Sequence, residues 1–402
     1  MEEMTKKRSE QKPSKTKSIL PAEEPIRNNV RSMRKAMGMT QAELACKVRL
    51  TRQDMYAIES NQYLPSTAIS LRLARILECK VEDLFCLSPM DETIEAELLG
   101  AAPDHDQPLR VKISQVGHRV IARPISQLGD LLNFVMPADG IVTSPLHKKH
   151  SRKPPTVQVN LLHARKEIQH QIVIAGCDPS LFLAGEHIRH QHALAGVTNW
   201  TMGSTHALNA LLQGEVHMAG VHLVDSRTGE SNIPYLKQHV RGKDFLGIRF
   251  ASWVQGLFLR RGNPKHIRSG EDLSKRGIHL VNREVGSGAR FLLDSLLKKS
   301  GVLSQCVKGY EKEAASHLEV AHLIRDGVAD VGVGVESVAR YVGLDFIPLR
   351  EEQYDLILRK DILASHPMID RLFDAMVSRP FRQELQAIGG YDLSEIGKSL
   401  KW

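Results

Sequence analysis

The sequence has no long hydrophobic run, and this absence is the first limit on its class. No apolar stretch approaches the roughly 20 residues that a membrane-spanning helix needs. The first residues are polar and basic, without the apolar segment of a secretion signal behind them. We therefore expect a cytoplasmic protein with no membrane partner.

Cysteine is scarce as well. The five cysteines are an odd number, lie far apart and form no Cys-x-x-Cys pair, which excludes a disulfide framework. They are Cys46, Cys79, Cys86, Cys177 and Cys306. The first three fall in or beside expected helices, where we expect buried free thiols.

The common catalytic signatures are also missing. The sequence contains no Gly-x-Ser-x-Gly elbow, no His-Glu-x-x-His pair and no phosphate-loop lysine motif. Ser287 lies in VGSGA, which lacks the flanking pattern of a nucleophile elbow. We expect no enzyme activity and no cofactor.

What is present is an ordinary globular composition with a basic bias. At 402 residues, with 42% hydrophobic and 25% charged residues, the chain is too long for one core and predicts two or three domains. The net charge is +8, and residues 1–88 hold 16 Lys and Arg against 11 Asp and Glu. This excess agrees with a phosphate-binding surface near the N-terminus, and a solubilising surface is the alternative.

The segment from Thr40 to Pro65 predicts two short helices joined by a tight turn. Thr40 is a good N-cap for the first helix, and Glu43 three residues later completes a capping box. The inward face of this helix is formed by Leu44, Ala45 and Val48. A residue as small as Ala45 lets two helices cross closely over a short turn.

The second helix opens at Thr51, only three residues after the first one ends. Met55 and Ile58 recur at helical spacing on its buried side. Its outward face is formed by Arg52, Gln53, Tyr56 and Ala57. Arg and Gln can bond guanine and adenine edges in bidentate fashion, so this face suits a major groove. A helical hairpin with a solvated polar face is the alternative.

At these residues the chain resembles the Cro/repressor (Xre-type) helix-turn-helix family, over about residues 26–87. The segments NNVRSMRKAMG, TQAELA, TRQDMYAIE and STAISLRLARILE carry the resemblance. Two turn positions that usually hold Gly are Arg49 and Asn61 here, and Arg49 in a left-handed conformation costs on the order of 1 kcal/mol. The resemblance implies double-stranded DNA as partner and a DNA-binding set of Gln41, Thr51, Arg52, Gln53, Tyr56, Ala57 and Ser60. In that set, Gln41 and Ser60 would touch phosphates, while Arg52, Gln53 and Ala57 would meet bases.

From about residue 167 the pattern alternates between strands and helices and predicts mainly parallel sheets covered on both faces. Such sheets bind ligands beyond the carboxyl ends of their strands. Two Gly-Ser loops lie at such positions, one at 203–205 and one at 286–288 with Arg290 one turn later. Helix N-termini, hydroxyls and an Arg predict an anion site, although Ser or Thr after Gly is also a plain N-cap.

Residues 169–388 resemble the two-lobed periplasmic-binding-protein superfamily, and more closely the cytoplasmic binding domain fused to helix-turn-helix regulators and molybdopterin-synthesis proteins. GCDPSL, GSTHALNALLQGEVHMAGVHLVD, NREVGSGARFLLD and HLIRDGVADVGVGVES carry the resemblance. It implies two α/β lobes joined by crossover strands, with a ligand such as molybdate or tungstate between them. The expected ligand-binding set is Cys177, Asp178, Gly203, Ser204, Thr205, Arg283, Gly286, Ser287, Gly288, Arg290 and Glu336. Asp178 and Glu336 would repel an oxyanion unless they bond an organic part of the ligand, and helix capping is their alternative role.

Eighteen histidines raise the question of a metal site. His187 and His190 share a helix face with His192 close by, while His206 and His222 lie elsewhere without zinc-type spacing. We expect surface or packed histidines and no metal.

The expected fold is multidomain: an all-α helix-turn-helix domain, a small β-rich connector and a two-lobed α/β domain like the periplasmic binding proteins. We expect a disordered arm at 1–24, the helix-turn-helix domain at 25–88 and the connector at 89–165. The two-lobed domain should span 166–390, followed by a tail at 391–402. The connector holds the basic loop 147–155, which we expect to be an exposed linker, and contact with DNA or an acidic partner is the alternative.

The expected function is a ligand-responsive transcriptional regulator that senses a small anion as a homodimer or higher homo-oligomer. Two alternatives stay open. One is an enzyme acting on a small anionic substrate, and the other is a DNA-binding protein whose second half holds partners.

Overall fold

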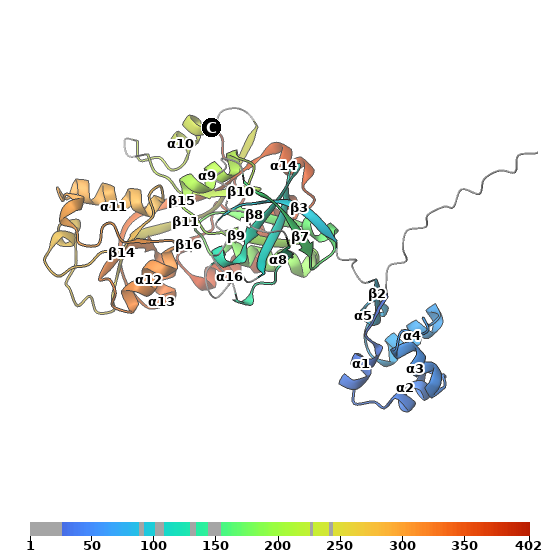
Figure 1. The fold of residues 1–402 in the computed structure, drawn as a ribbon. Coiled ribbons are helices and arrows are strands. Elements are labelled where there is room, and N and C mark those ends of the chain that lie inside the picture. Colours follow the sequence, from blue (N-terminus) through green and yellow to red (C-terminus); the bar gives the residue numbers. More distant parts are fainter. Residues whose placement is uncertain are drawn as a thin grey trace, which may run out of the picture. The chain divides into compact units, whose positions relative to one another are not determined.

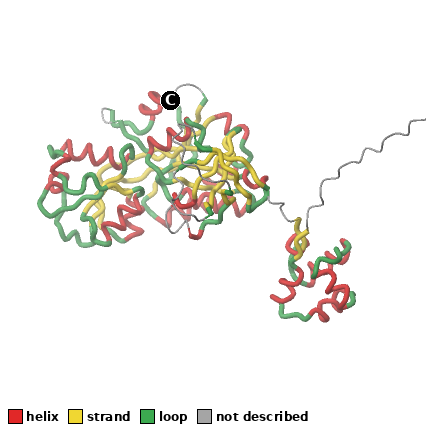
Figure 2. The backbone as a smooth tube through the Cα atoms, viewed as in Figure 1, coloured by secondary structure: helices red, strands yellow, loops and turns green. Residues whose placement is uncertain are grey.

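The computed structural model describes residues 26–87, 92–100, 108–128, 134–143, 154–225, 228–240 and 244–402. The chain divides into two compact units, residues 1–92 and 93–402. Figures 1 and 2 show a helical first unit and a larger second unit that combines strands and helices. The expected arm 1–24 and most of the basic loop 147–155 lie outside the described residues.

The first unit is a bundle of short helices closed by a small sheet. Strands β1 and β2 pair antiparallel, with Ile26 opposite Leu87. The elements are β1 (Ile26–Asn28), α1 (Val30–Ala36), α2 (Gln41–Val48), α3 (Arg52–Glu59), α4 (Thr67–Ile76), α5 (Val81–Leu84) and β2 (Phe85–Leu87).

The caps of α2 and α3 are the ones that the sequence predicts. Thr40 and Glu43 form a complete capping box on α2. Thr51 caps α3, and Asp54 completes a second capping box there. These caps satisfy backbone N–H groups that otherwise have no partner at a helix start, which fixes where both helices begin.

The two helices pack through the residues expected on their inward faces. Leu44, Ala45, Val48, Met55 and Ile58 are all buried in one core. The prediction that this segment forms a close helix pair is confirmed. The expected burial of Cys46 is wrong, because its position in α2 places it on the exposed face of that helix.

The turn between the helices adopts the strained backbone that the sequence suggests. Arg49 has φ 61° and ψ 45°, the left-handed conformation, and ends α2. Asn61 after α3 has φ 58°. Only Arg49 carries the full steric cost of that conformation, since Asn tolerates it better.

The second unit begins with a closed five-stranded barrel, ordered β3-β5-β4-β6-β7. Alternating apolar side chains fill its interior, among them Val111, Ile113, Ala122 and Val159. Its strands are β3 (Thr93–Leu98), β4 (Leu109–Val116), β5 (Arg119–Pro124), β6 (Gly140–Val142) and β7 (Thr156–Leu161). A 3₁₀ turn covers Ile125–Leu128 after β5.

Two α/β lobes follow the barrel (Figure 1). The first lobe contains α7 (Arg165–Ile168), β8 (Gln171–Ala175), α8 (Leu181–Gln191), β9 (Gly196–Trp200), α9 (Ser204–Leu212), β10 (Met218–Val221), α10 (Ile233–His239), α14 (Lys360–Ser365), α15 (Ile369–Val377), α16 (Arg379–Ile388) and β16 (Tyr391–Asp392). The second lobe contains η2 (Gly270–Ser274), β12 (Asn282–Arg283), α11 (Gly288–Lys299), η3 (Ser304–Cys306), β13 (Glu313–Ala314), α12 (His317–Arg325), β14 (Val331–Val335) and α13 (Glu336–Val342).

Two long strands, β11 (Phe245–Leu259) and β15 (Asp345–Arg359), pair antiparallel along their length and run through both lobes. They belong to a sheet with the order β14-β11-β15-β10-β8-β9. The expectation of mainly parallel sheets is therefore wrong. In the described part of the two lobes, β8 pairs in parallel with β9 and β10, and β12 pairs in parallel with β13. The crossover strands β11 and β15 run antiparallel to their neighbours β14 and β10.

The barrel is bound to the first lobe at the C-terminal end of α9. Arg119 of β5 donates from Nη1 to the carbonyl oxygens of Gln213 at 2.6 Å and Gly214 at 3.2 Å. Arg123 bonds Glu215 at 3.0 Å, also in the turn after α9. The barrel and the first lobe thus meet directly, and the turn after α9 is part of this contact.

Candidate functional site

The outward face of α3 presents the side chains expected to meet DNA bases. Arg52 and Gln53 are exposed in its first turn, and Tyr56 is 57% exposed. Thr51 uses its hydroxyl to cap the helix, and Ala57 is half-buried. An exposed polar first turn is what a helix entering a major groove requires.

Gln41 and Ser60, expected at phosphates, both have contacts within the first unit. Gln41 donates to Glu59 at 3.1 Å, and the same carboxylate binds Arg34 at 2.6 Å. Ser60 donates to the Tyr56 carbonyl at 2.7 Å. The Arg34–Glu59 pair is buried and joins α1 to the end of α3, so it holds the exposed helix in place.

In the second unit, the two Gly-Ser loops bring the lobes together. Thr205 at the start of α9 donates from Oγ1 to the Gly286 carbonyl of the second lobe at 2.8 Å. A Cβ placed on Gly203 would lie 2.9 Å from Glu284 Oε1, so glycine permits this approach. A Cβ on Gly288 would overlap the His222 ring. The glycines expected to bind an anion therefore form the contact between lobes.

The serines of these loops have protein partners. Ser287 caps α11, accepting from the Arg290 N–H at 3.2 Å and donating to the Glu284 carbonyl at 2.9 Å. Ser204 accepts from the backbone N–H of His222 at 3.0 Å. Ser287 therefore acts as the N-cap of α11, which is the alternative role given above for a Ser after Gly.

Arg290 lies against groups of its own lobe. Its guanidinium stacks 4.1 Å from the Tyr310 ring centre and donates to the Arg283 carbonyl at 3.2 Å. It also approaches Glu313 at 3.4 Å. Glu336, the last residue of the expected set, pairs with Arg340 along α13 at 2.6 Å.

Arg283 and Asp178 are ionisable groups buried on opposite lobes. Arg283 is held by Glu284 at 2.8 Å and by the carbonyls of Ala314 and Ala315, but its Nη1 has no partner among the described residues. Asp178 accepts from the Tyr391 hydroxyl at 2.9 Å. Burial raises the pKa of the Asp178 carboxyl above its usual range, which favours the protonated form.

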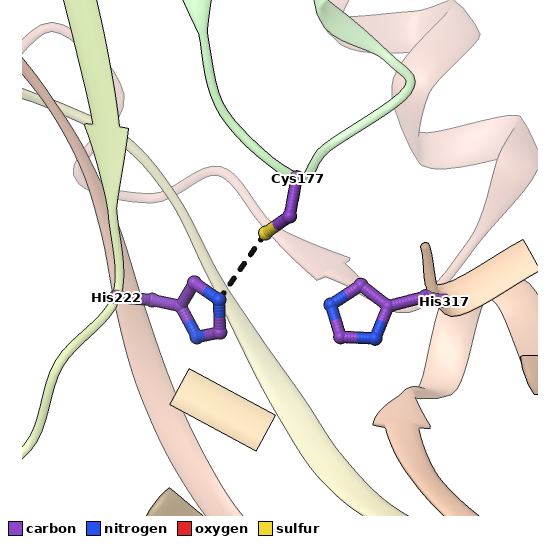
Figure 3. A group of neighbouring side chains, drawn as sticks. All are labelled: Cys177, His222 and His317. Carbon is purple, nitrogen blue, oxygen red and sulfur yellow. Dashed lines mark hydrogen bonds between the residues drawn. The ribbon is translucent and has the colours of Figure 1, made fainter. Parts of the chain in front are cut away.

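The structure also assembles a cluster that the sequence analysis missed. Cys177 follows β8, His222 follows β10 and His317 begins α12, and one ligand atom of each lies within 4.8 Å of the others. Figure 3 shows the sulfur and the two rings pointing toward one another. Cys177 Sγ lies 3.2 Å from His222 Nε2. The three residues have no regular spacing in the sequence, and only the placement of two of them after parallel strands could have linked them.

His222 is enclosed between a sulfur and a carboxylate. Its Nδ1 lies 2.9 Å from Glu352 Oε2 on β15. Burial alone would lower the pKa of His222, but Cys177 and Glu352 on either side raise it to about 10. His317 differs, because burial and the nearby Arg283 hold its pKa well below the usual range.

Other histidines of the expected helix lie elsewhere. His187 pairs with Glu384 at 2.6 Å, His190 is exposed and His192 is half-buried. Among the described residues, Cys177, His222 and His317 form the one group of three side chains with ligand atoms close enough for a metal ion. No helix in the described part of the chain is long and apolar enough to cross a membrane.

Comparisons with known proteins agree with the two units. Residues 30–84 match the helix-turn-helix family, and residues 185–376 match the family described as PBP superfamily domain. An uncharacterised protein of Bacillus subtilis, YvgK, is 32% identical over 227 residues, which are 56% of this chain and 72% of that protein. An uncharacterised helix-turn-helix-type transcriptional regulator of Methanothermobacter thermautotrophicus is 43% identical over 63 residues, which are 15% of this chain and 91% of that protein.

Among solved structures, a putative phosphate transporter substrate-binding protein of Clostridium perfringens with bound phosphate resembles the second unit. The match covers 57% of this chain and 100% of that chain, with 13% identity and a TM-score of 0.42.

Proposed function

The chain belongs to the helix-turn-helix regulators and carries a PBP superfamily domain, and we propose that it is a transcriptional regulator that senses a small anion between its two lobes. In this proposal α3 binds operator DNA in the cytoplasm, and the protein acts as a homodimer. The pairing of a DNA-binding domain with a binding-protein domain supports sensing as the purpose of the second unit.

The observation that carries the anion assignment is the buried Arg283. This guanidinium is 1% exposed, and its Nη1 lacks a partner among the described residues. Trp253 Nε1 on β11 is a second buried donor without a partner. Buried donors are rarely left unpaired, and an anion beside Arg283 would give its Nη1 a partner. A protonated Asp178 would add a third donor.

Helix α9 supplies a route from the ligand to the barrel. Its first residues, Ser204 and Thr205, contact His222 and Gly286 at the meeting of the lobes. The turn after its last residue is bound by Arg119 and Arg123 of the barrel. Closure of the lobes on an anion would move α9 and hence the barrel, changing the spacing of two DNA-binding domains in a dimer.

A thermal-shift screen of the full chain tests this proposal. The panel contains molybdate, tungstate, sulfate, phosphate and anionic metabolites. An anion present at 100 times its dissociation constant should stabilise the second unit by about 2.7 kcal/mol. Arg283→Lys keeps the charge but removes the spare donor, so it should weaken the shift. Arg340→Ala, at an exposed pair, should leave the shift unchanged. A folded protein that responds to no anion in the panel would refute anion sensing.

One observation favours a second candidate, an enzyme acting on a small anionic substrate. His222 lies between Cys177 Sγ, 3.2 Å from its Nε2, and Glu352 Oε2, 2.9 Å from its Nδ1. A cysteine nucleophile, its histidine base and an orienting carboxylate have the same order. Incubation with phosphate and carboxylate esters, followed by mass measurement of the Cys177 peptide, would detect a covalent intermediate. Ester turnover that is lost in Cys177→Ser would favour the enzyme.

A further inference from the structure

The cluster of Cys177, His222 and His317 combines the side chains that bind soft and borderline metal ions. Thiolate and imidazole are the preferred ligands of Zn²⁺ and Cu⁺ in proteins. The three residues come from both lobes, since Cys177 and His222 belong to the first and His317 to the second (Figure 3). All three are buried.

His317 supplies the independent sign that a ligand is missing. It is 2% exposed, and neither ring nitrogen has a hydrogen-bond partner among the described residues. A buried polar group without partners is costly, and it is uncommon in folded proteins. The His317 ring centre lies 6.2 Å from that of His222, so one ion between the rings would reach both.

The surroundings of His222 resemble those of a metal-bound histidine. Such a residue usually gives its second ring nitrogen to a carboxylate, which fixes the ring and its tautomer. Glu352 Oε2 occupies this position, 2.9 Å from His222 Nδ1, and Gln255 holds the same oxygen at 2.8 Å. The opposite nitrogen, Nε2, is the one that approaches Cys177.

We propose that Cys177 Sγ, His222 Nε2 and a ring nitrogen of His317 bind one transition-metal ion of the Zn²⁺ type. With usual Zn–S and Zn–N bond lengths, tetrahedral ligation separates S and N by about 3.6 Å. The present separation of Cys177 and His222 is 3.2 Å, so a few tenths of an ångström of opening admits the ion. The Cys177 thiolate supplies one negative charge to the ion, and the Glu352 carboxylate, which also pairs with Arg350, lies behind His222.

The same geometry argues against a cysteine nucleophile as the whole explanation. A catalytic arrangement of nucleophile, base and carboxylate would use Cys177, His222 and Glu352, and it would leave His317 without a role. A packed core histidine would use its nitrogens for hydrogen bonds, as His217 does with Val173 and Gln115 at 2.9 Å each. A metal ion gives His317 a bond and unites all three side chains.

Three protein ligands leave a tetrahedral ion one open position. In the proposed sensing function, the anion would occupy that position on the metal. Only this part of the proposal rests on the sensing function. Metal binding itself does not require that an anion bind.

The test begins with full-length protein freed of metal by a chelator. Added Zn²⁺ should bind in a ratio of one ion per chain, measured by elemental analysis after gel filtration. Added Co²⁺ should give visible bands and thiolate-to-metal charge transfer. X-ray absorption of the wild-type zinc form should show one sulfur and two imidazole nitrogens. A zinc shell of oxygen alone, or no uptake at all, would overturn the proposal without use of any variant.

Matched variants assign the ligands. Cys177→Ser should abolish the cobalt charge-transfer band, and both Cys177→Ser and His317→Gln should abolish stoichiometric zinc binding. The controls Cys306→Ser and His187→Gln should change neither. Glu352→Gln should weaken zinc binding by about 10- to 100-fold. Circular dichroism and DNA binding check that each variant folds. Full zinc uptake by folded Cys177→Ser and His317→Gln would refute the site.

The anion screen, repeated with and without Zn²⁺, separates the two proposals. Zinc uptake without any anion shift would leave the metal site intact and refute anion sensing. An anion shift in protein that takes up no zinc would refute the metal site alone.

Discussion

The two proposed sites differ in how far apart their residues lie in the sequence. One belongs to the helix-turn-helix unit, and the other lies where the two lobes meet. The face expected to read DNA comes from one helix, α3, and its caps. The cluster between the lobes draws Cys177, His222 and His317 from three separate elements. The first is therefore set by local helix geometry, and the second exists only when distant strands have found their places.

This difference implies that the two units respond separately to damage, and the buried Arg249–Asp355 pair tests it most strongly. Arg249 Nε lies 2.5 Å from Asp355 across the crossover strands, and both residues are buried. Arg249→Ala leaves the carboxylate without its partner and should cost about 3–5 kcal/mol of unfolding free energy in the second unit. Calorimetry should show the second transition lowered and the first unchanged. Equal movement of both transitions would contradict the separation.

The next largest effect is expected on DNA binding. Arg52→Ala and Gln53→Ala should each remove about 1–3 kcal/mol of discrimination at one base pair. Fluorescence anisotropy with operator and mutated operator DNA measures this loss. Zinc and anion binding should stay unchanged in both variants. Operator preference that survives both changes would show that α3 does not read the bases.

Acidification should weaken the second unit through His217. Burial lowers the pKa of His217 to about 3, and the neighbouring His366 adds to this effect. Between pH 6.5 and about 3, the unfolded chain binds a proton that the folded chain does not, so stability falls as pH falls. The loss from pH 7 to 5 is about 2 kcal/mol.

Urea unfolding at the two pH values measures this loss. His217→Gln, which keeps a donor and an acceptor but cannot titrate, should reduce the dependence. An unchanged slope in the folded variant would assign the pH effect to other groups.

The smallest predicted effect is a gain. Arg49→Gly removes the left-handed strain and should stabilise the first unit by about 1 kcal/mol. Lys47→Gly, two residues earlier inside α2, should instead destabilise it by about 1 kcal/mol. Thermal unfolding of the two variants separates backbone strain from a general effect of glycine.

The sequence predicted most where neighbouring residues decide the structure. The Thr40–Glu43 capping box, the buried Ala45 and the left-handed Arg49 all follow from residues within one or two helical turns. The β-rich connector and the α/β alternation were also predictable from patterning. Closure of the barrel was not, because pairing of β3 with β5 and β7 depends on strands far along the chain.

Long-range packing also decides what the predicted ligand residues contact. Arg290 lies one turn after a Gly-Ser loop that resembles an anion site, yet its guanidinium stacks on Tyr310 from a separate segment. His222 lacked any zinc-type spacing, but the fold brings Cys177 and His317 to it. Spacing rules detect metal sites made within one motif and miss those made between lobes.

Helix α9 touches the lobe contact with Thr205 and the barrel through the turn at Gln213. If α9 couples the two sites, the coupling is mutual by thermodynamic linkage. The factor by which the effector changes operator affinity is also the factor by which the operator changes effector affinity. In the proposed mechanism, DNA is then itself an effector of the cleft. Operator-bound protein and free protein would then respond to different concentrations of the same small molecule.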